Sequence, residues 1–408
     1  MTDAKIVFFT NKNYKNNPML KMYNDAFSSA YQCYYSCTDS KFLEDSDKSL
    51  FIPDNTFYWG YFTALYKKII PLRNRGKYVF KGIGKVKYFF GMLYYILYII
   101  DYIIANIRIA VKMALVSRKK NIKTVFSIDA DYLLASYLYS KYKKSSFIYS
   151  VYEMWPEEII PTTLPEYFSG KARVKLERFL CHKADKIITV DETWNRIIRR
   201  RYLIEDSKFI VVPVCPYQVD LPNIQTLRNP IKFHYHGGLL LSRGLDSLIK
   251  AFEHIEDGVL YIRGSGFDEQ KIKNLINELR LESKVYILPS VPMEQLVSQA
   301  LVYDVGIIIA KPDTLNGRMC TGFKFFEYMN SGLAIMAPSS YPLVSFINKL
   351  SCGINYGWPN TDTFINEINN LIKNKSSILY MKKSSIIASQ YYNSRVQKKR
   401  LFDLVLQY

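Results

Sequence analysis

The chain has 408 residues, of which 49% are hydrophobic and 22% are charged, and this composition excludes an intrinsically disordered protein. Its length exceeds what one hydrophobic core normally organises, so we expect two domains of roughly 200 residues each. The net charge of +19 fits a nucleic acid, an anionic lipid surface or an anionic substrate as partner. No zinc-finger motif, RNA-recognition motif or long basic run is present, which argues against nucleic acid.

The start of the chain and its cysteines indicate the compartment. The polar residues Met1–Lys5 run directly into an apolar strand, predicted for Lys5–Thr10, so no signal peptide is expected. The six cysteines form no CxxC pair and have no metal-ligand spacing to the four histidines. This pattern argues against structural zinc and is typical of a reducing compartment. We therefore expect a cytoplasmic protein.

A polar loop, Asn11–Asn17, follows the first strand. Ligands of open α/β sheets bind at the carboxyl ends of the strands. Lys12 and Lys15 in this loop can therefore meet an anionic acceptor substrate. The alternative, a solvated loop without a ligand, fits the sequence equally well.

Residues 85–120 carry an aromatic and aliphatic run, Tyr88–Ile100, without a charge. This run is well short of the roughly 20 residues that span a bilayer, and the charged residues Asp101, Arg108 and Lys112 interrupt the apolar pattern after it. Two interpretations remain open. The segment is a helix packed on the sheet of the first domain, or it is also an interfacial helix whose basic neighbours bind anionic lipid.

Next comes the motif Asp129-Ala130-Asp131, directly after a strand predicted from Lys123 to Ile128. Two carboxylates at this spacing can hold Mg²⁺ or Mn²⁺ against a diphosphate. The simpler interpretation is that Asp131 caps a helix predicted for residues 132–142.

A further strand, Phe147–Tyr152, leads into Glu153-Met154-Trp155-Pro156. The Tyr152 hydroxyl can donate a hydrogen bond at this position, and the Glu153 carboxylate can act as a base toward an acceptor hydroxyl. Alternatively, the glutamates here only stabilise the first turn of a helix through its dipole.

The second half begins after a proline-rich stretch between Val211 and Pro230, the best candidate for a linker. A strand predicted for Ile231–Tyr235 is followed by the turn His236-Gly237-Gly238 and then by Arg243 at the start of a helix. Glycines let the backbone approach a diphosphate, and an arginine can pair with it. A later strand ends at Gly264-Ser265-Gly266, which is a weak phosphate-binding signal.

The most informative stretch is Thr321–Ile335. A polar loop leads into a short helix carrying Lys324 and Glu327, and Gly332 ends that helix before an apolar strand. A helix N-terminus at Gly322 and Phe323, together with a lysine, suits a bound phosphate. A solvated ion pair is the ordinary alternative for a lysine and a glutamate at this spacing.

These motifs resemble GT-B glycosyltransferases, particularly family four, whose Lys-x-x-Glu-Tyr-Met helix matches Lys324–Met329. A second stretch also follows that family's pattern, at Ala184, Asp185, Ile187, Ile188, Val190 and Glu192. The resemblance implies two Rossmann-like, doubly wound domains facing a central cleft, with a C-terminal helix that crosses back to the first domain. It implies an acceptor domain at 1–215, a donor domain at 216–385 and the terminal helix at 386–408.

By the same resemblance, the chain is a glycosyltransferase that moves a sugar from a UDP- or GDP-sugar to a hydroxyl of a glycan or lipid-linked acceptor in surface polysaccharide synthesis. The resemblance implies retention of configuration, with no metal and no cofactor. The aromatic and basic first half leaves open whether the cytoplasmic protein is also peripheral on the inner face of the cell membrane. Arg243, Lys324, Tyr152 and Glu153 are the implied catalytic residues. The implied donor-binding residues are Gly237, Gly238, Arg243, Gly264, Val291, Gly322, Phe323, Lys324 and Glu327.

Three positions depart from the family pattern. Tyr152 stands where the family has histidine, Gly238 where it has arginine, and Met319 where it has the sugar-contacting glutamate. Asp313 and Asn316 are candidate substitutes for that glutamate. The departures keep two alternatives open: a non-catalytic GT-B partner subunit and a sugar-nucleotide epimerase of the same fold.

Overall fold

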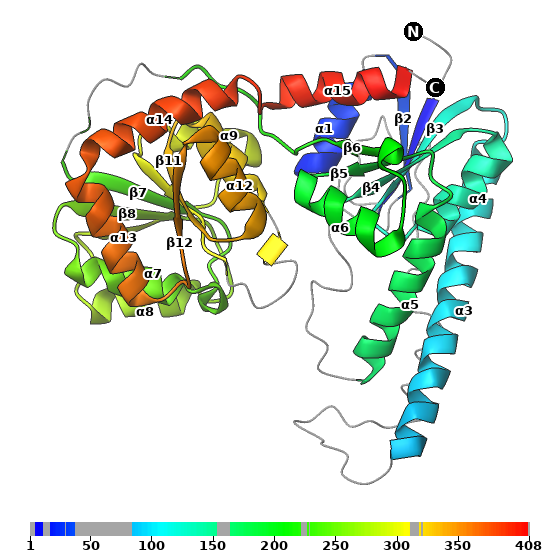
Figure 1. The fold of residues 1–408 in the computed structure, drawn as a ribbon, viewed down its shortest axis with the longest axis horizontal. Helices are drawn as coiled ribbons and strands as arrows, with labels where there is room; N and C mark the ends of the chain where they lie inside the picture. Colours follow the sequence, from blue (N-terminus) through cyan, green and yellow to red (C-terminus); the bar gives the residue numbers. More distant parts are fainter. Residues whose placement is uncertain are drawn as a thin grey trace. The chain divides into compact units, whose positions relative to one another are not determined.

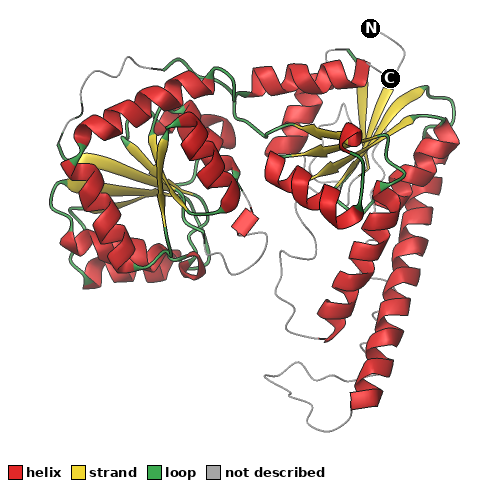
Figure 2. Cartoon of the chain, in the orientation of Figure 1, coloured by secondary structure: helices red, strands yellow, loops and turns green. Residues whose placement is uncertain are grey.

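The computed structural model describes residues 5–10, 17–28, 30–36, 84–152, 164–221, 227, 229–310, 318–319 and 321–406. The chain divides into two compact units, one made of Met1–Val212 with Leu401–Tyr408 and the other of Pro213–Arg400. In each unit, helices surround a central parallel β-sheet (Figures 1 and 2). The predicted α/β class with doubly wound sheets is confirmed.

The first unit holds a six-stranded sheet in the order β2-β1-β3-β4-β5-β6. Every neighbouring pair of strands is parallel. Since β1 lies between β2 and β3, the winding of the sheet reverses there. Its elements are β1 (Lys5–Phe9), α1 (Pro18–Phe27), β2 (Gln32–Ser36), α3 (Gly84–Val116), β3 (Ile122–Ile128), α4 (Leu133–Lys143), β4 (Ser146–Val151), α5 (Leu164–Cys181), β5 (Lys186–Thr189), α6 (Glu192–Tyr202), η4 (Asp206–Lys208) and β6 (Phe209–Val211).

Both faces of this sheet are covered, so β1 and β3 read as continuous apolar runs. On one face, Phe8 of β1 stacks on Phe126 of β3 with ring centroids 5.0 Å apart, and Phe27 of α1 packs on Phe126 at 5.6 Å. On the other face, residues of α3, including Ile109 and Met113, join the core with β1 and β3. The prediction that part of the 85–120 segment packs on the sheet is therefore confirmed.

Polar side chains of α3 hold the N-terminus of α4. The Asn106 Oδ1 accepts a hydrogen bond from the backbone N–H of Ala135 at 2.8 Å, and its Nδ2 donates to the carbonyl oxygens of Tyr102 and Asp131. The Tyr102 hydroxyl donates to the carbonyl of Ala130 at 2.9 Å. Since the first N–H groups of a helix lack partners within it, α3 supplies the capping that α4 needs.

This arrangement changes the interpretation of the Asp129-Ala130-Asp131 motif. The N-cap of α4 is Tyr132, not Asp131 as predicted. The Asp131 carboxylate instead lies 3.3 Å from Nη1 of Arg173 on α5. Among the described residues, no group of three or more His, Cys, Asp or Glu is placed to hold a metal ion.

The second unit holds a second six-stranded parallel sheet, in the order β12-β11-β10-β7-β8-β9. Its elements are β7 (Ile231–His236), η5 (Leu241–Arg243), α7 (Leu245–Ala251), η6 (Phe252–His254), β8 (Gly258–Arg263), α8 (Glu269–Glu278), β9 (Val285–Leu288), α9 (Met293–Ala300), β10 (Val305–Ile307), α11 (Phe323–Asn330), β11 (Ala334–Pro338), α12 (Tyr341–Leu350), β12 (Gly353–Tyr356), α13 (Thr361–Lys373), α14 (Lys375–Ser389) and α15 (Ser394–Leu406). Its first strand, β7, lies between β10 and β8, so the winding reverses between β7 and β10.

The last helix, α15, belongs to both units. Its residues up to Arg400 group with the second unit, and those from Leu401 group with the first. Within the first unit, Leu401 and Leu404 are buried, and the ring centroid of Phe402 lies 6.1 Å from that of Tyr31. Among the described helices, none combines the length and hydropathy needed to cross a bilayer.

Replacing Asn106 by alanine tests the polar contact between α3 and α4. Asn106 is fully buried, so Asn106→Ala leaves the Ala135 N–H and two carbonyl oxygens without this partner. We expect a loss of about 1 to 3 kcal/mol in the free energy of unfolding, measured with a chemical denaturant. The matched control is Asn277→Ala, since Asn277 is an exposed asparagine of α8. Equal stability of the two variants would contradict the role of Asn106.

Candidate nucleotide-sugar site

The predicted donor residues of the second unit gather at the carboxyl end of β7, where the winding of the sheet reverses. β7 ends at His236 and is followed by Gly237, while α11 carries Lys324 and Glu327 to the same place. In open α/β sheets this is the position at which ligands bind. The helix predicted around Lys324 is confirmed as α11, and Gly332 follows it with a left-handed φ of 66°.

Glu327 forms a buried pair with His236. Its Oε2 lies 2.7 Å from Nε2 of His236, and the two residues are only 8% and 3% exposed. The imidazole donates through Nε2 to the carboxylate. Its other nitrogen, Nδ1, is buried and has no hydrogen-bond partner among the described residues. Burying a carboxylate without a partner would destabilise the fold, because the charge loses its hydration. The hydrogen bond to His236 compensates for that loss and fixes the orientation of the Glu327 carboxylate.

Tyr328, the next residue of α11, ties the helix to both central strands. Its hydroxyl accepts a hydrogen bond from the His236 backbone N–H at 3.0 Å and donates to the Ile307 carbonyl of β10 at 3.2 Å. Its ring covers Gly306, where an added Cβ would lie 2.4 Å from the ring carbon Cγ. Glycine at position 306 therefore makes room for the tyrosine that fixes α11 over β7 and β10.

Lys324 lies directly against the turn that follows β7. A Cβ added at Gly237 would lie 2.7 Å from the Lys324 Nζ, and Gly237 has a φ of 137° that favours glycine. The same Nζ lies 4.6 Å from the centroid of the Tyr235 ring, within the range of a cation–π contact. Lys324 is the second residue of α11, whose N-cap, Gly322, has no side chain to cap the helix. This end of α11 thus combines a cation with backbone N–H groups, which suits an anion.

The Gly264-Ser265-Gly266 turn packs against the turn after β7. A Cβ at Gly264 would lie 1.9 Å from the Gly237 carbonyl oxygen, and one at Gly266 would lie 2.5 Å from the Leu239 carbonyl oxygen. The Leu239 N–H also donates to the Ser265 carbonyl at 3.1 Å. These glycines are therefore required for close contact between two loops, and a contact of Gly264 with the donor stays a prediction.

The remaining predicted donor residues are placed less closely. Arg243 is exposed at the end of η5, and among the described residues no ion pair joins it to Glu327. Val291 is half-buried in the loop after β9. At Gly238 an added Cβ would meet only the Leu240 side chain, at 3.8 Å.

In the first unit, only some of the predicted residues can be described. Tyr152 is half-buried at the end of β4, and its backbone N–H donates to Oδ1 of Asp129 at 2.9 Å. Glu153 lies outside the described residues. The same is true of Lys12 and Lys15 in the first unit, and of Asp313 and Asn316 in the second.

Sequence reasoning missed His236 as the partner of Glu327. The two residues are 91 positions apart, and no local spacing relates them. A usable signal was nevertheless present, because a polar side chain stood at the end of an otherwise buried strand, at the reversal point of the predicted sheet.

A second histidine of β7, His234, lies beneath this site. Its Nδ1 donates to the Tyr261 carbonyl at 3.1 Å, and its ring stacks on that of Tyr303 at 4.2 Å. Burial, reinforced by the neighbouring His236 and Arg263, lowers the pKa of His234 to about 3.

The lowered pKa of His234 makes stability depend on pH. Between about 3 and the unfolded value of about 6.5, the unfolded chain binds a proton that the folded chain does not. The free energy of unfolding therefore falls as pH falls through this window, by about 1.4 kcal/mol per pH unit from this residue. The free energy of unfolding is measured with urea at several pH values across this window. His234→Phe keeps the ring stacking, and in this variant the free energy of unfolding should fall less steeply with falling pH than in the wild type. An unchanged slope would contradict the effect of burial on His234.

The second unit matches a family model. Residues 222–387 match the model described as glycosyl transferases group 1. No curated protein matches the chain in sequence.

Solved structures match the whole chain. A glycosyltransferase from Rickettsia africae aligns with a TM-score of 0.68 at 12% identity and covers 99% of this chain and 98% of its own. HepE of Anabaena, solved with UDP, aligns at 0.67 and 11% identity over 99% and 100%. Sucrose-phosphate synthase from Thermosynechococcus elongatus aligns at 0.67 and 12% identity over 99% and 98%. The chain thus has the GT-B fold, and its residues 222–387 match the model of glycosyl transferases group 1.

Proposed function

We propose that the second unit binds a nucleotide diphosphate sugar and that the protein transfers the sugar to a hydroxyl of a glycan or lipid-linked acceptor. The family match supports a glycosyltransferase. The observation that carries the proposal is the junction of β7 and α11. There the Lys324 amine lies against the Gly237 turn, beside a carboxylate that His236 holds in place.

In the proposed reaction, the bond between the anomeric carbon and the diphosphate oxygen breaks, and that carbon forms a bond to the acceptor hydroxyl oxygen. Negative charge develops on the departing diphosphate. Lys324 and the N-terminus of α11 would stabilise it electrostatically, and Arg243 is a further candidate. The hydroxyl proton passes to a base, for which Glu153 stays the sequence-based candidate. We further propose retention of configuration without a metal ion.

Glu327 is proposed to bind the ribose of the donor. One of its carboxylate oxygens, Oε2, accepts from His236. The second oxygen, Oε1, would accept from a ribose hydroxyl. Because the carboxylate is held by the imidazole before the ligand arrives, little orientational freedom would be lost on binding.

Similar structures point to the nucleotide. HepE has been solved with UDP and with UDP-glucose, the latter aligning with a TM-score of 0.63 at 13% identity. The lipopolysaccharide outer core galactosyltransferase WaaB aligns at 0.60 and 14% identity. We therefore propose a UDP-sugar as the first donor to test, a GDP-sugar as the second, and a surface glycan as the acceptor.

The reaction is proposed to take place in the cytoplasm. Cys181, Cys215 and Cys352 are buried thiols, and burial raises the pKa of each of them. These cysteines are free rather than paired in disulfides, which is typical of proteins that fold in a reducing compartment.

Loss of turnover in two variants tests the proposed site. UDP-glucose, UDP-galactose and GDP-mannose are incubated with the protein, and release of the nucleoside diphosphate is measured with and without EDTA. The preferred donor should be hydrolysed in both conditions. Lys324→Ala and Glu327→Gln should each lower the rate about 100-fold or more, because each removes an interaction with the bound donor. The control, Lys250→Ala, replaces an exposed lysine of α7 and should keep the wild-type rate.

Three outcomes would contradict this function. If donor hydrolysis survives both substitutions, Lys324 and Glu327 are not part of the catalytic site. The absence of binding and turnover with every donor would favour a non-catalytic partner subunit. Conversion of a donor into its epimer, detected by NMR of the sugar, would favour an epimerase.

A further inference from the structure

Three buried side chains beside and beneath the nucleotide-sugar site carry polar atoms that meet no partner in the described part of the chain. These atoms are Nε of Arg263, Nδ1 of His236 and Nε2 of His234. The three residues are only 7%, 3% and 1% exposed. Buried polar atoms are nearly always hydrogen-bonded to protein or to ordered water, so each of these atoms needs a partner.

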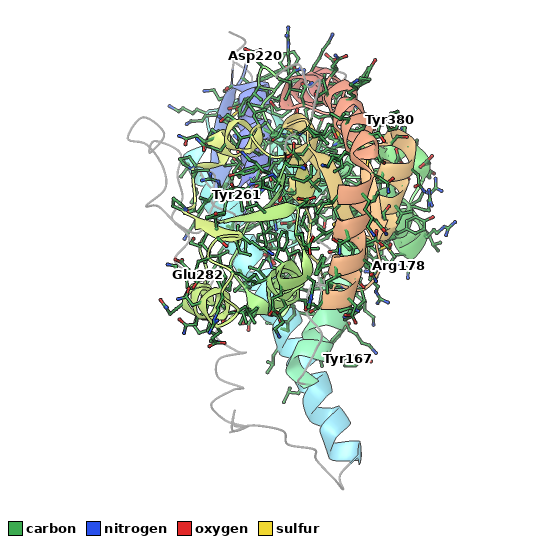
Figure 3. The ribbon with its side chains drawn as sticks, turned by 90° about the vertical axis from the view of Figure 1, so that its left-hand side faces the viewer. Tyr167, Arg178, Asp220, Tyr261, Glu282 and Tyr380 are labelled. Carbon is green, nitrogen blue, oxygen red and sulfur yellow. The ribbon has the colours of Figure 1, made fainter. Side chains whose placement is uncertain are left out.

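The three side chains are neighbours on one face of two adjacent strands. His236 of β7 pairs with Arg263 of β8 in the parallel sheet, and His234 pairs with Tyr261, which is labelled in Figure 3. Paired residues of adjacent strands share a face, and so do residues two apart along one strand. The ring centroids of His234 and His236 are 5.5 Å apart. Burial first, and then His236 and Arg263, lower the pKa of His234, so both groups lie near its ring.

Arg263 carries a buried positive charge with few partners. Its Nη1 donates to the Pro289 carbonyl, which follows β9, at 3.0 Å. No carboxylate among the described residues forms an ion pair with it, and Glu327, the carboxylate of the site, is bonded to His236 instead. A guanidinium taken out of water destabilises the fold unless its charge and its donors are compensated. Arg263 therefore has a donor, its Nε–H, available for a further acceptor.

The two imidazoles offer acceptors that match this donor. The Glu327 carboxylate only accepts, so Nε2 of His236 carries a proton, and in a neutral ring Nδ1 is then a bare acceptor. The Tyr261 carbonyl likewise accepts from Nδ1 of His234, which leaves Nε2 of that ring bare. The cluster thus combines one N–H donor with two bare nitrogens. A water molecule, with two O–H groups and an oxygen that accepts, matches all three.

We propose that one buried water accepts from Nε of Arg263 and donates to Nδ1 of His236 and Nε2 of His234, and that Arg263 is thereby a positioning residue for the donor site. Two hydrogen bonds of about 2.8 Å let a water join nitrogens up to about 5.5 Å apart, which exceeds the spacing of adjacent strands, about 4.8 Å.

The consequence of this arrangement concerns the charge of Glu327. The water occupies the lone pair of Nδ1, and the positive guanidinium opposes a second proton on the His236 ring. His236 then stays neutral while it donates to Oε2 of Glu327, and Oε1 keeps its negative charge for a ribose hydroxyl. This effect on the donor rests on the proposed function, whereas the water and the protonation of His236 do not.

NMR of the imidazole nitrogens tests the protonation of His236 directly. The full-length protein is labelled with 15N in its four histidines alone, and His236→Phe identifies the signals of His236. Bare and protonated nitrogens differ clearly in chemical shift. At pH 7 the wild type should carry a proton on Nε2 and none on Nδ1. In Arg263→Met, which removes the donor and the charge, Nδ1 should gain a proton, because the Glu327 carboxylate then favours an imidazolium.

Two further variants are the controls for this measurement. Arg263→Lys keeps a positive charge and a donor, so Nδ1 of His236 should stay bare. Arg395→Met replaces an exposed arginine of α15 and should leave the signals of His236 unchanged. Thermal unfolding checks that each variant is folded, and Arg263→Gln takes the place of Arg263→Met if the latter is not.

Calorimetric titration of UDP measures the effect on the donor site. Arg263→Met should bind UDP about tenfold more weakly than the wild type, because an imidazolium beside Glu327 competes with the ribose for the carboxylate. Arg263→Lys should recover most of the affinity. If neither the wild type nor any variant binds UDP, the proposed donor site is wrong, and the nitrogen signals still decide the role of Arg263.

Three findings would overturn the proposal. The first is a wild type in which Nδ1 of His236 carries a proton. The second is a folded Arg263→Met variant in which Nδ1 stays bare. The third is a crystal structure of the wild type that resolves ordered waters and shows none between Arg263 and His236.

Discussion

The hydrogen-bonded pair of Glu327 and His236 is the constraint around which the second unit is organised. A carboxylate can be buried at the end of a central strand only when a partner compensates for its lost hydration. The partner stands on β7, so the pair fixes α11 over the carboxyl end of that strand. Tyr328 repeats this connection through its hydroxyl, and Gly306 leaves the space its ring requires. Lys324 is thereby held against Gly237, where the backbone can approach a ligand.

Most of this architecture could be predicted from the sequence, because it depends on local signals. The alternation of apolar strands with helices predicted two parallel sheets, and parallel order places the turn at Gly237 and the helix of Lys324 on the same edge. The partner of Glu327 could not be identified from local spacing, since the pairing of residues 91 positions apart depends on how β7 and α11 pack. The sequence indicated only that a polar residue, His236, stands at the end of a buried strand. Gly264 shows a second limit. Its close contact with the Gly237 carbonyl requires glycine by itself, so the motif alone does not indicate a ligand.

The first unit shows how the two sides of one helix differ in a way that a sequence pattern cannot separate. The aromatic and aliphatic composition of α3 is compatible with a core helix and with an interfacial one. The contacts distinguish its two sides. Asn106 and Met113 fix one side inside the unit, whereas Ile107 and Val111 line the other. The hydrogen bonds from Asn106 to the N-terminus of α4 could not be predicted either. Asp131 lies next to the start of α4 in the sequence, so it was the expected capping residue. Asp131 instead pairs with Arg173.

Calorimetric titration of UDP into the wild-type protein and into His236→Phe tests whether the buried pair organises the site. We expect UDP to bind the wild type and to bind the variant about tenfold or more weakly, because Glu327 loses the partner that orients it. Circular dichroism and thermal unfolding establish that the variant is folded. If the folded variant bound UDP with unchanged affinity, the pair of Glu327 and His236 would not organise the nucleotide site.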